Sequence, residues 1–288
     1  MKEYPLISIV TPSYNHAEYL EETILSVISQ NYPNLEYIII DGGSTDGSID
    51  IIKKYEKSLK YWISEADNGL YDALNKGFKK STGEIMGWLN SDDILHRQSL
   101  FVIADIFASQ KHVKWLQGYP TVIDGIGSIV SHRRPRFSKY SFYIKEYHDG
   151  IFIQQESTYW RRNLWSETGG HISQEYKYAG DFELWIRFYK YAELHITSAL
   201  IGAFRIRSGQ ISEVYYKSYL QECDMIIEKA INTFNSGLRT EIRKLRTLKK
   251  IQQRLPLISK LLFVSRFIRK IEGTAKEVLF NFKDQQFY

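Results

Sequence analysis

The 288-residue sequence has a single cysteine, Cys223, which excludes disulfide bonds within the chain and metal sites built from several cysteines. We expect Cys223 to be a small buried apolar residue in a protein of a reducing compartment. No stretch approaches the roughly 20 consecutive apolar residues that cross a bilayer. The first residues lack the charged, apolar and small-residue pattern of a secretory signal. We therefore expect a cytoplasmic protein.

The sequence also lacks the glycine-rich loops of two common nucleotide-binding families. The segment TPSYN follows the first strand-like run and contains no glycine. A dinucleotide-binding dehydrogenase would have the pattern G-x-G-x-x-G at this place. A sugar-nucleotide pyrophosphorylase would have a glycine-rich loop with Arg and Lys there. Both enzyme classes are therefore disfavoured.

Positive charge is concentrated at the end of the chain. Residues 238–288 hold thirteen Lys and Arg against four Asp and Glu, a net charge of +9, whereas residues 1–237 carry −4. Basic residues alternate there with Leu, Ile, Phe and Val, as in a helix that lies on an anionic membrane surface. Packing against the rest of the chain or against a second subunit, as in a homodimer, explains the apolar residues equally well. No recognition motif for nucleic acid accompanies the charge, so we expect no nucleic-acid partner.

The first hundred residues alternate between strand-like and helix-like patterns. Asn15 and Ser48 are expected to cap helices, and GLYDALNKGFKKSTG predicts a third helix. Apolar runs predict strands over residues 6–11, 35–40, 60–65 and 84–90. Because strands that are covered on both faces are continuous apolar runs, we expect an α/β fold with a mostly parallel sheet between two layers of helices.

The pattern changes after residue 110. A helix begins near Asp181, and ELHITSALIGAFRIR predicts one strand after it. The segments VKWLQGYPTVID, GSIVSH and KYSFYI are strand-like and rich in aromatic residues. From Tyr215 onward, three helical segments are broken near residues 236–237 and Pro256. We expect one domain over residues 1–212, with halves at 1–110 and 111–212, followed by a basic amphipathic helical tail over residues 213–288.

Polar and mostly acidic residues follow each of the four predicted strands, in segments 11–15, 41–46, 65–68 and 91–93. Open parallel sheets bind ligands at the carboxyl ends of their strands, so these segments should meet at one edge. A single Asp there is more often a turn residue or helix cap, but four such ends together favour a binding site.

The adjacent carboxylates of Asp92 and Asp93 indicate a cation site. Two carboxylates about 5 Å apart repel by roughly 3 kcal/mol at an effective dielectric constant near 20. A site with oxygen ligands and few carboxylates suits Mg²⁺ or Mn²⁺ better than zinc. The alternative is that both are solvated residues that cap a helix starting near His96 or Arg97.

Five segments together resemble family 2 of the glycosyltransferases, which have the GT-A fold: ISIVTPSYN, YIIIDGGSTDGS, EADNGLYDALNKG, GEIMGWLNSDD and YAGDFELWIRF. They cover residues 6–93 almost continuously and parts of 150–212. The sequences of three segments resemble those of the bacterial enzymes that build O-antigen and capsular polysaccharide: GLYDALNKG, GWLNSDD and QQESTYWRR. The resemblance implies a Rossmann-like, mostly parallel sheet flanked by helices, with a C-terminal helical extension.

The resemblance also implies an activity. It is that of an inverting, Mg²⁺- or Mn²⁺-dependent enzyme that moves a sugar from a nucleotide-diphosphate sugar, most often a UDP-sugar, to a hydroxyl group of a glycan acceptor. A lipid-linked acceptor would bring the protein to the inner face of the cytoplasmic membrane, with residues 238–288 as a peripheral contact. The alternative is a non-catalytic module of the same fold that binds a nucleotide sugar or a glycan.

On the donor side, the resemblance implies that Tyr14 stacks on the nucleobase and that Asp41 accepts a hydrogen bond from it. It also implies that Asp92 contacts the ribose and that Asp93 contacts the metal. The residues implied to bind the donor are Thr11, Pro12, Tyr14, Asp41, Asp67, Asp72, Asn75 and Asp92.

On the acceptor side, Asp181 is implied to be the base that deprotonates the acceptor hydroxyl, and its position also suits a helix cap. Gln155, Glu156 and Trp160 are implied to face the acceptor, and Trp160 suits a core position equally well. The segment that closes on the diphosphate contains Arg205, Arg207, Gln210 and Ser212. Many relatives have a metal-binding histidine where Arg207 stands, so the set of metal ligands stays open.

Overall fold

A central sheet organises the chain, which the computed structural model describes for residues 4–254, 276–281 and 283–288. Within these residues its strands are β1 (Ile7–Ser13), β2 (Leu35–Asp41), β3 (Tyr61–Ser64), β4 (Ile85–Trp88), β6 (Trp115–Gly118), β9 (Thr158–Arg161), β10 (His195–Thr197) and β12 (Lys276–Val278). Their order across the sheet is β12-β10-β6-β9-β4-β1-β2-β3. β9 runs antiparallel to both of its neighbours, and the other pairings are parallel.

A smaller sheet lies beside the central one. In the described part of the chain it has the order β5-β11-β7-β8. Its strands are β5 (Ile94–Leu95), β7 (Thr121–Ile123), β8 (Ile129–His132) and β11 (Gly202–Arg205), and a separate hairpin consists of β13 (Phe280–Asn281) and β14 (Gln286–Phe287).

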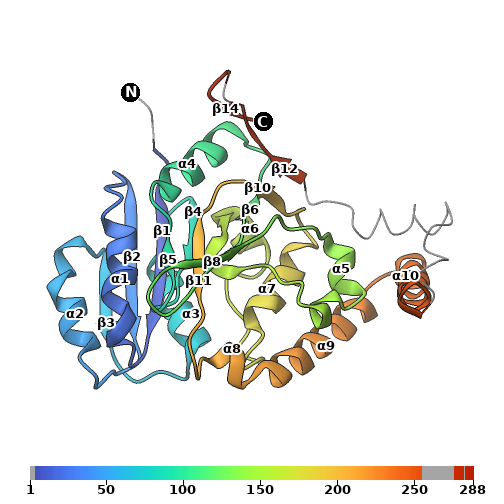
Figure 1. The fold of residues 1–288 in the computed structure, drawn as a ribbon, viewed down its shortest axis with the longest axis horizontal. Helices are drawn as coiled ribbons and strands as arrows, with labels where there is room; N and C mark the ends of the chain where they lie inside the picture. The colour runs from blue at the N-terminus through green and yellow to red at the C-terminus, as the bar shows by residue number, and fades with distance from the viewer. Residues whose placement is uncertain (1–3, 255–275, 282) are drawn as a thin grey trace.

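Helices cover the sheet, and Figure 1 shows the chain running from α1 and α2 at the left to α10 at the right. The α-helices are α1 (Ala17–Ile28), α2 (Ser48–Lys54), α3 (Leu70–Lys80), α4 (Ser99–Ser109), α5 (Lys139–Tyr143), α6 (Arg162–Glu167), α7 (Gly180–Phe188), α8 (Ile211–Val214), α9 (Tyr216–Asn232) and α10 (Ser236–Arg254). Short 3₁₀ turns are η1 (Glu56–Ser58), η2 (Glu146–Asp149) and η3 (Gln155–Ser157). None of the helices in these described ranges is both long and apolar enough to cross a membrane.

Successive residues of the central strands face two different apolar cores. Val10 and Ile38 pack in one core with α3 and α7, whereas Ile9 and Ile39 pack in the other with α1 and α4. Because successive side chains of a strand point to opposite faces, helices cover both faces of the sheet. The predicted α/β fold with a mostly parallel sheet is confirmed.

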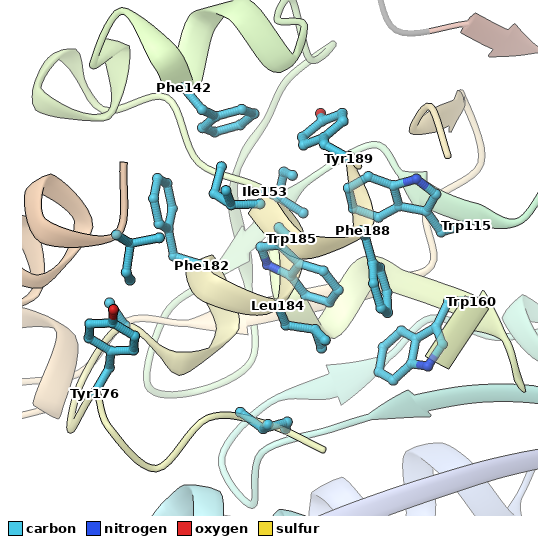
Figure 2. Packing of buried hydrophobic residues seen from close by; sticks show 14 of the residues in the cluster. Trp115, Phe142, Ile153, Trp160, Tyr176, Phe182, Leu184, Trp185, Phe188 and Tyr189 are labelled. Carbon is cyan, nitrogen blue, oxygen red and sulfur yellow. The ribbon is translucent and has the colours of Figure 1, made fainter. Parts of the chain in front are cut away.

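The core on the α7 side is rich in tryptophan. Trp88 stacks on Trp185 with ring centres 5.6 Å apart, and Trp160 lies 5.6 Å from Trp88 and 5.7 Å from Phe188. Figure 2 shows Trp160 beside Phe188 and below Trp185. Trp160 has no exposed surface. It is therefore a core residue, and the predicted contact between Trp160 and an acceptor sugar is wrong.

Two segments fold differently from the prediction. KYSFYI was expected to be a strand, but residues 139–143 form α5, because Ser141 joins Ser138 in a capping box and the helix then buries Phe142 and Tyr143. Residues 193–207 were expected to be one strand, but they form β10 and β11. These strands belong to different sheets.

Both predicted helix caps are shifted. α1 begins after His16, while Asn15 has a positive φ of 52° and its Oδ1 accepts a hydrogen bond from the Thr45 amide at 2.9 Å. Ser48 is the first residue of α2, and its hydroxyl accepts a hydrogen bond from the His16 amide at 3.2 Å. The two polar residues thus connect the starts of two helices instead of capping their own.

The described residues after 212 pack against the rest of the chain and do not form a separate tail. Cys223 and Ile227 of α9 are buried in the same core as α7, as predicted for Cys223. β12 pairs with β10 and extends the central sheet. α9 and α10 agree with two of the three expected helical segments, and the third falls in residues 255–275, outside the described residues.

The close approach of α3 to β1 gives a test of this packing. A Cβ atom added at Gly77 would lie 2.3 Å from Val10 Cγ1 in the buried interface. We expect Gly77→Ala to lower the free energy of unfolding by about 1 to 2 kcal/mol, because overpacking strain exceeds the roughly 1 kcal/mol helix preference of Ala over Gly. Urea unfolding would measure the change. Gly125→Ala is the control, since a Cβ there meets open space, and an unchanged midpoint in Gly77→Ala would contradict the packing.

Candidate active site

The polar segments after the central strands meet at one edge of the sheet, as predicted. The Asn15 amide donates to Ser44 Oγ at 2.8 Å, which joins the segments after β1 and β2. His16 Nδ1 lies 2.6 Å from Ser91 Oγ, which adds the segment after β4. These contacts hold three strand ends together as a single surface.

The side chains of Tyr14 and Asp67 both lie beside Gly42 on this surface. A Cβ atom at Gly42 would lie 2.9 Å from Asp67 Oδ2 and 3.3 Å from Tyr14 Cδ2, so only glycine leaves the two side chains room. Tyr14 is 61% exposed. An exposed aromatic ring facing a carboxylate suits a planar, hydrogen-bonding ligand.

Other predicted donor-binding residues lie inside the fold. Thr11 and Pro12 are buried in β1, and Thr11 Oγ1 lies 3.1 Å from the Tyr37 hydroxyl. Asp41 has no exposed surface, and its carboxylate accepts hydrogen bonds from the amides of Gly43 and Ser44 and from two serine hydroxyls. The structure therefore supports an internal role for these residues, with Asp41 holding the loop after β2, and not a direct ligand contact.

Asp72 and Asn75 of α3 also connect parts of the fold. Asn75 makes two hydrogen bonds of 2.8 Å with the backbone of Ile172. The Asp72 carboxylate accepts from the Asn68 amide at 3.0 Å and from Gln174 Nε2 at 3.1 Å. They fix the loops on either side of the site, so the prediction that they line the donor pocket is not supported.

The two adjacent carboxylates, to which different roles were predicted, differ in their exposure to solvent. Asp93 is buried, and its oxygens accept hydrogen bonds from the Arg205 amide at 2.9 Å and from Asn90 Nδ2 at 3.2 Å. Burial, together with the charges of Asp92 and Glu156, raises the pKa of Asp93 well above its usual value. Asp92 is partly exposed. Asp92 is the carboxylate that a ligand can reach, and the assignment of the metal contact to Asp93 does not fit.

Arg207 lies against Asp92. Its Nε donates to Asp92 Oδ2 at 3.0 Å, and its Nη2 donates to His16 Nε2 at 2.8 Å. Burial and the charge of Arg207 lower the pKa of His16, although the charge of Asp92 opposes this. Because Nε2 accepts a hydrogen bond, Nδ1 of the neutral ring carries the proton and donates a hydrogen bond to Ser91 Oγ.

Arg205 is a structural residue behind this pair. Its side chain is fully buried, donates to the Asp92 carbonyl at 2.7 Å and forms an ion pair with Glu22 at 2.5 Å. Gln210 Oε1 accepts from the Arg207 amide at 3.0 Å, and Gln210 Nε2 donates to the exposed Ser212 at 2.6 Å. Among the described contacts of the predicted diphosphate segment, Arg205 reaches the Asp93 carboxylate through its backbone amide, and Arg207 reaches the Asp92 carboxylate through its side chain.

Glu156 lies between Asp92 and Asp181. It is buried in η3, and its Oε1 has no hydrogen-bond partner among the described residues. Burial, together with the charges of Asp92 and Asp181, raises the pKa of Glu156 to about 8. The neighbouring Gln155 donates to the carbonyl of Trp88 at the end of β4. Glu156 is therefore neutral at pH 7 and links the two carboxylates in one site.

Asp181 is the second residue of α7 and is partly exposed. Its Oδ1 lies 3.4 Å from the Tyr71 hydroxyl, and its Oδ2 lies 3.5 Å from the Tyr219 hydroxyl. Burial raises the pKa of Asp181 to about 6, although hydrogen bonds from the backbone and from both tyrosines lower it. An acid with a pKa near 6 is ionised at pH 7 and can still accept a proton.

The site also contains residues that the sequence analysis missed. Asn90 and Tyr71 lie within motifs of the sequence analysis and His16 directly follows one, but no role was predicted for any of them. Tyr219 and Glu222 of α9 belong to no motif, and the sequence gives no signal that could have identified them.

A divalent cation fits the site through Asp92. The described residues bring together no group of three His, Cys, Asp or Glu that could hold a metal ion by themselves. Mg²⁺ is, however, commonly bound by one or two carboxylates together with substrate phosphates. Besides Asp92, the neighbouring Asn90 has a buried Oδ1 with no hydrogen-bond partner in the described ranges. The partly exposed Asp92 is thus the oxygen donor that suits a hard cation, whose shell a bound diphosphate would complete.

Solved structures with this fold include glycosyltransferases. TarS residues 1–349 of S. aureus, in complex with UDP-GlcNAc, is similar with a TM-score of 0.67 and 17% identity over 92% of this chain and 81% of that one. The mannosyltransferase PcManGT of Pyrobaculum calidifontis, in complex with GDP-Man and Mn²⁺, has a TM-score of 0.55 and 14% identity over 92% of this chain and 86% of that one. At such identities the likeness shows the fold.

Sequence comparison identifies the family. The chain is 41% identical over 92 residues to the putative teichuronic acid biosynthesis glycosyltransferase TuaG of Bacillus subtilis (strain 168), which is 31% of this chain and 36% of TuaG. The chain spans less than two thirds of the length of the first curated relatives that it matches. The profile of glycosyl transferase family 2 matches residues 8–167, more than half of the sequence, and the chain therefore belongs to that family.

Proposed function

We propose that this chain transfers a sugar from a UDP-sugar to a hydroxyl group of a glycan acceptor. The observation that carries the proposal is that Glu156 is subject to the charges of both Asp92 and Asp181. A reachable carboxylate that suits a cation and a carboxylate that suits a base therefore border one site. Membership of glycosyl transferase family 2 and the likeness to TarS, which was solved with UDP-GlcNAc, support the donor class.

The donor would lie along the strand ends. The nucleobase of the donor would lie against Tyr14 and Asp67, and its diphosphate would lie beside Asp92 and Arg207. Arg207 would then exchange its contact with Asp92 for one with a phosphate, since a guanidinium binds phosphate as well as carboxylate.

Asp92, with Asn90 beside it, would hold Mg²⁺ or Mn²⁺ together with the diphosphate. The bound ion would stabilise the negative charge of the departing UDP. The Mn²⁺ in the PcManGT structure supports a metal in this fold, and the unpaired Asn90 Oδ1 supports its position in this chain.

Asp181 would act as the base. It would take the proton of the acceptor hydroxyl as that oxygen attacks the anomeric carbon, and the bond from that carbon to UDP would break with its electron pair leaving on the diphosphate. A single displacement from the face opposite to UDP inverts the anomeric configuration. The pKa of about 6 supports this role, because the carboxylate is ionised at pH 7.

The support for the proposed acceptor class is less direct than the support for the donor class. The similarity to TuaG, a putative glycosyltransferase of teichuronic acid biosynthesis, supports a glycan of the cell surface, as the sequence motifs do. A lipid-linked acceptor, a cytoplasmic location and a membrane contact through residues 238–288 belong to the proposal. The basic residues of α10 support that contact. A homodimer remains a prediction.

The first test concerns Asp181. We expect kcat/KM to fall about tenfold per pH unit below pH 6, because the protonated acid cannot accept a proton. Asp181→Asn should lower kcat by about 10² to 10⁴-fold. Release of the nucleoside diphosphate from a panel of UDP-, GDP- and dTDP-sugars with Mn²⁺ would measure both. Asp50→Asn, an exposed acid of α2, is the matched control. Activity that survives Asp181→Asn would contradict the role of Asp181 as the base. Binding of a nucleotide sugar without release of its nucleoside diphosphate would favour a non-catalytic binding module.

The second test concerns the cation. Removing divalent ions with EDTA should abolish UDP release, and Mn²⁺ or Mg²⁺ should restore it. Asp92→Asn should weaken Mn²⁺ binding, measured by electron paramagnetic resonance with UDP present, by at least about tenfold. Asp93→Asn is the matched comparison and should keep Mn²⁺ binding, because Asp93 is buried and its oxygens already accept hydrogen bonds from Arg205 and Asn90. The opposite ranking of the two variants would return the metal contact to Asp93.

A further inference from the structure

A single carboxylate of α9 holds the segment that precedes Asp181. Glu222 accepts three backbone N–H groups, from Lys177 at 3.0 Å and from Tyr178 and Ala179 at 2.8 Å each. Ala179 occupies the N-cap position of α7 and has no side-chain oxygen with which to cap the helix. The position of the start of α7, and with it Asp181, thus depends on Glu222.

A second set of contacts from the same helix reaches Asp181 itself. Tyr219, one turn before Glu222, has its hydroxyl 3.5 Å from Asp181 Oδ2. From the other side, the Tyr71 hydroxyl donates to the Tyr178 carbonyl at 2.7 Å and lies 3.4 Å from Asp181 Oδ1. The ionisable groups that face Asp181 are thus Tyr71 of α3, Tyr219 and Cys223 of α9, and Glu156 of η3.

Tyr178, in the segment that Glu222 holds, stacks on a second tyrosine, Tyr215. The rings of Tyr178 and Tyr215 are 4.7 Å apart and only 17° from parallel. Tyr178 is partly exposed and Tyr215 is 43% exposed, so the pair is open to solvent although it is held in place. Tyr178 is fixed by Glu222 and Tyr71, and Tyr215 directly precedes α9.

Further aromatic and apolar residues extend this surface. Phe152, from the loop before Glu156, packs edge-on against Tyr216 and Tyr219 at 6.4 and 5.7 Å. Tyr216 is 40% exposed, and Ile211 and Val214 of α8 are also exposed. A solvent-facing aromatic surface beside an ionisable acid resembles a recognition site more than a core.

We propose that Tyr178 and Tyr215 form a platform on which a pyranose ring of the acceptor stacks, and that Glu222 is the positioning residue that holds this platform against Asp181. The proposal rests on the proposed function, because it makes the hydroxyl of the stacked sugar the nucleophile that Asp181 deprotonates. The aliphatic C–H face of a pyranose fits an aromatic ring, and its hydroxyl edge is left free for a carboxylate.

The platform is tested by binding of simple pyranosides. Saturation-transfer NMR on the full chain with UDP and Mn²⁺ would measure the affinity for a panel of 4-nitrophenyl hexopyranosides. Tyr178→Leu and Tyr215→Leu should weaken binding by about two- to tenfold, as expected for the loss of an aromatic contact. Tyr178→Phe and Tyr215→Phe keep the rings and should bind as the wild type does. Tyr191→Leu, which changes an exposed tyrosine that follows α7, is the control.

The positioning role is tested by kinetics. Glu222→Ala should lower kcat at least about tenfold while the affinity for UDP, measured by calorimetry, stays the same. Glu222→Gln keeps an acceptor oxygen and should recover part of the rate. Glu175→Gln is the matched control, because it breaks an exposed ion pair with Lys229 that also connects this segment to α9. A general loss of structure would lower the UDP affinity as well.

The outcomes separate the two proposals. Unchanged pyranoside affinity in both Leu variants, or no pyranoside binding by the wild type, would overturn the platform. An unchanged kcat in Glu222→Ala would overturn the positioning role. Asp181→Asn should still bind pyranosides, so a protein that binds them through the tyrosines but never releases UDP would refute the proposed function and leave the platform intact.

Discussion

The whole site depends on how the fold keeps several carboxyl groups close together. Asp92, Asp93, Glu156 and Asp181 interact electrostatically, and carboxylates about 5 Å apart repel by roughly 3 kcal/mol at an effective dielectric constant near 20. Burial raises the pKa of both Asp93 and Glu156, which favours their neutral forms and lowers the negative charge of the group. Arg207 balances the charge of Asp92. Only Asp181 remains ionised without a cation beside it, and this gives it the character of a base.

Arg205 is the residue that joins this arrangement to the rest of the fold. Its buried guanidinium pairs with Glu22 of α1, donates to the Asp92 carbonyl, and donates to the carbonyls of residues 124 and 125 in the turn after β7. Its own amide binds Asp93. A buried charge is stable only when its donors are satisfied, so the small sheet, α1 and the acidic loop must come together for any of them to be in place.

Sequence patterns predicted the parts of the fold that depend on periodicity. The alternating strands and helices, the convergence of strand ends and the helix that begins near Asp181 all follow from residue spacing. The inward direction of Thr11 and Asn75 does not, because a polar residue beside a strand end can face the ligand or the neighbouring loop with the same local sequence. Trp160 is a similar case, since an aromatic residue stacks equally well on a sugar or on other tryptophans. The contribution of Tyr219 and Glu222 could not be predicted, because it depends on the docking of α9 about 40 residues after Asp181.

The division between the two sides of the site matches the extent of the family profile. The family profile covers residues 8–167 and therefore the strand ends, Asp92 and Glu156. Asp181, the stacked tyrosines and Glu222 all lie beyond it. Donor sugars share a nucleotide diphosphate, so the residues that face it can be common to many enzymes. Acceptors differ, and the surface that would bind them is built here from α7, α9 and the segments before them. The identity of the acceptor therefore has to be sought in the part of the chain after residue 167, where the family profile gives no information.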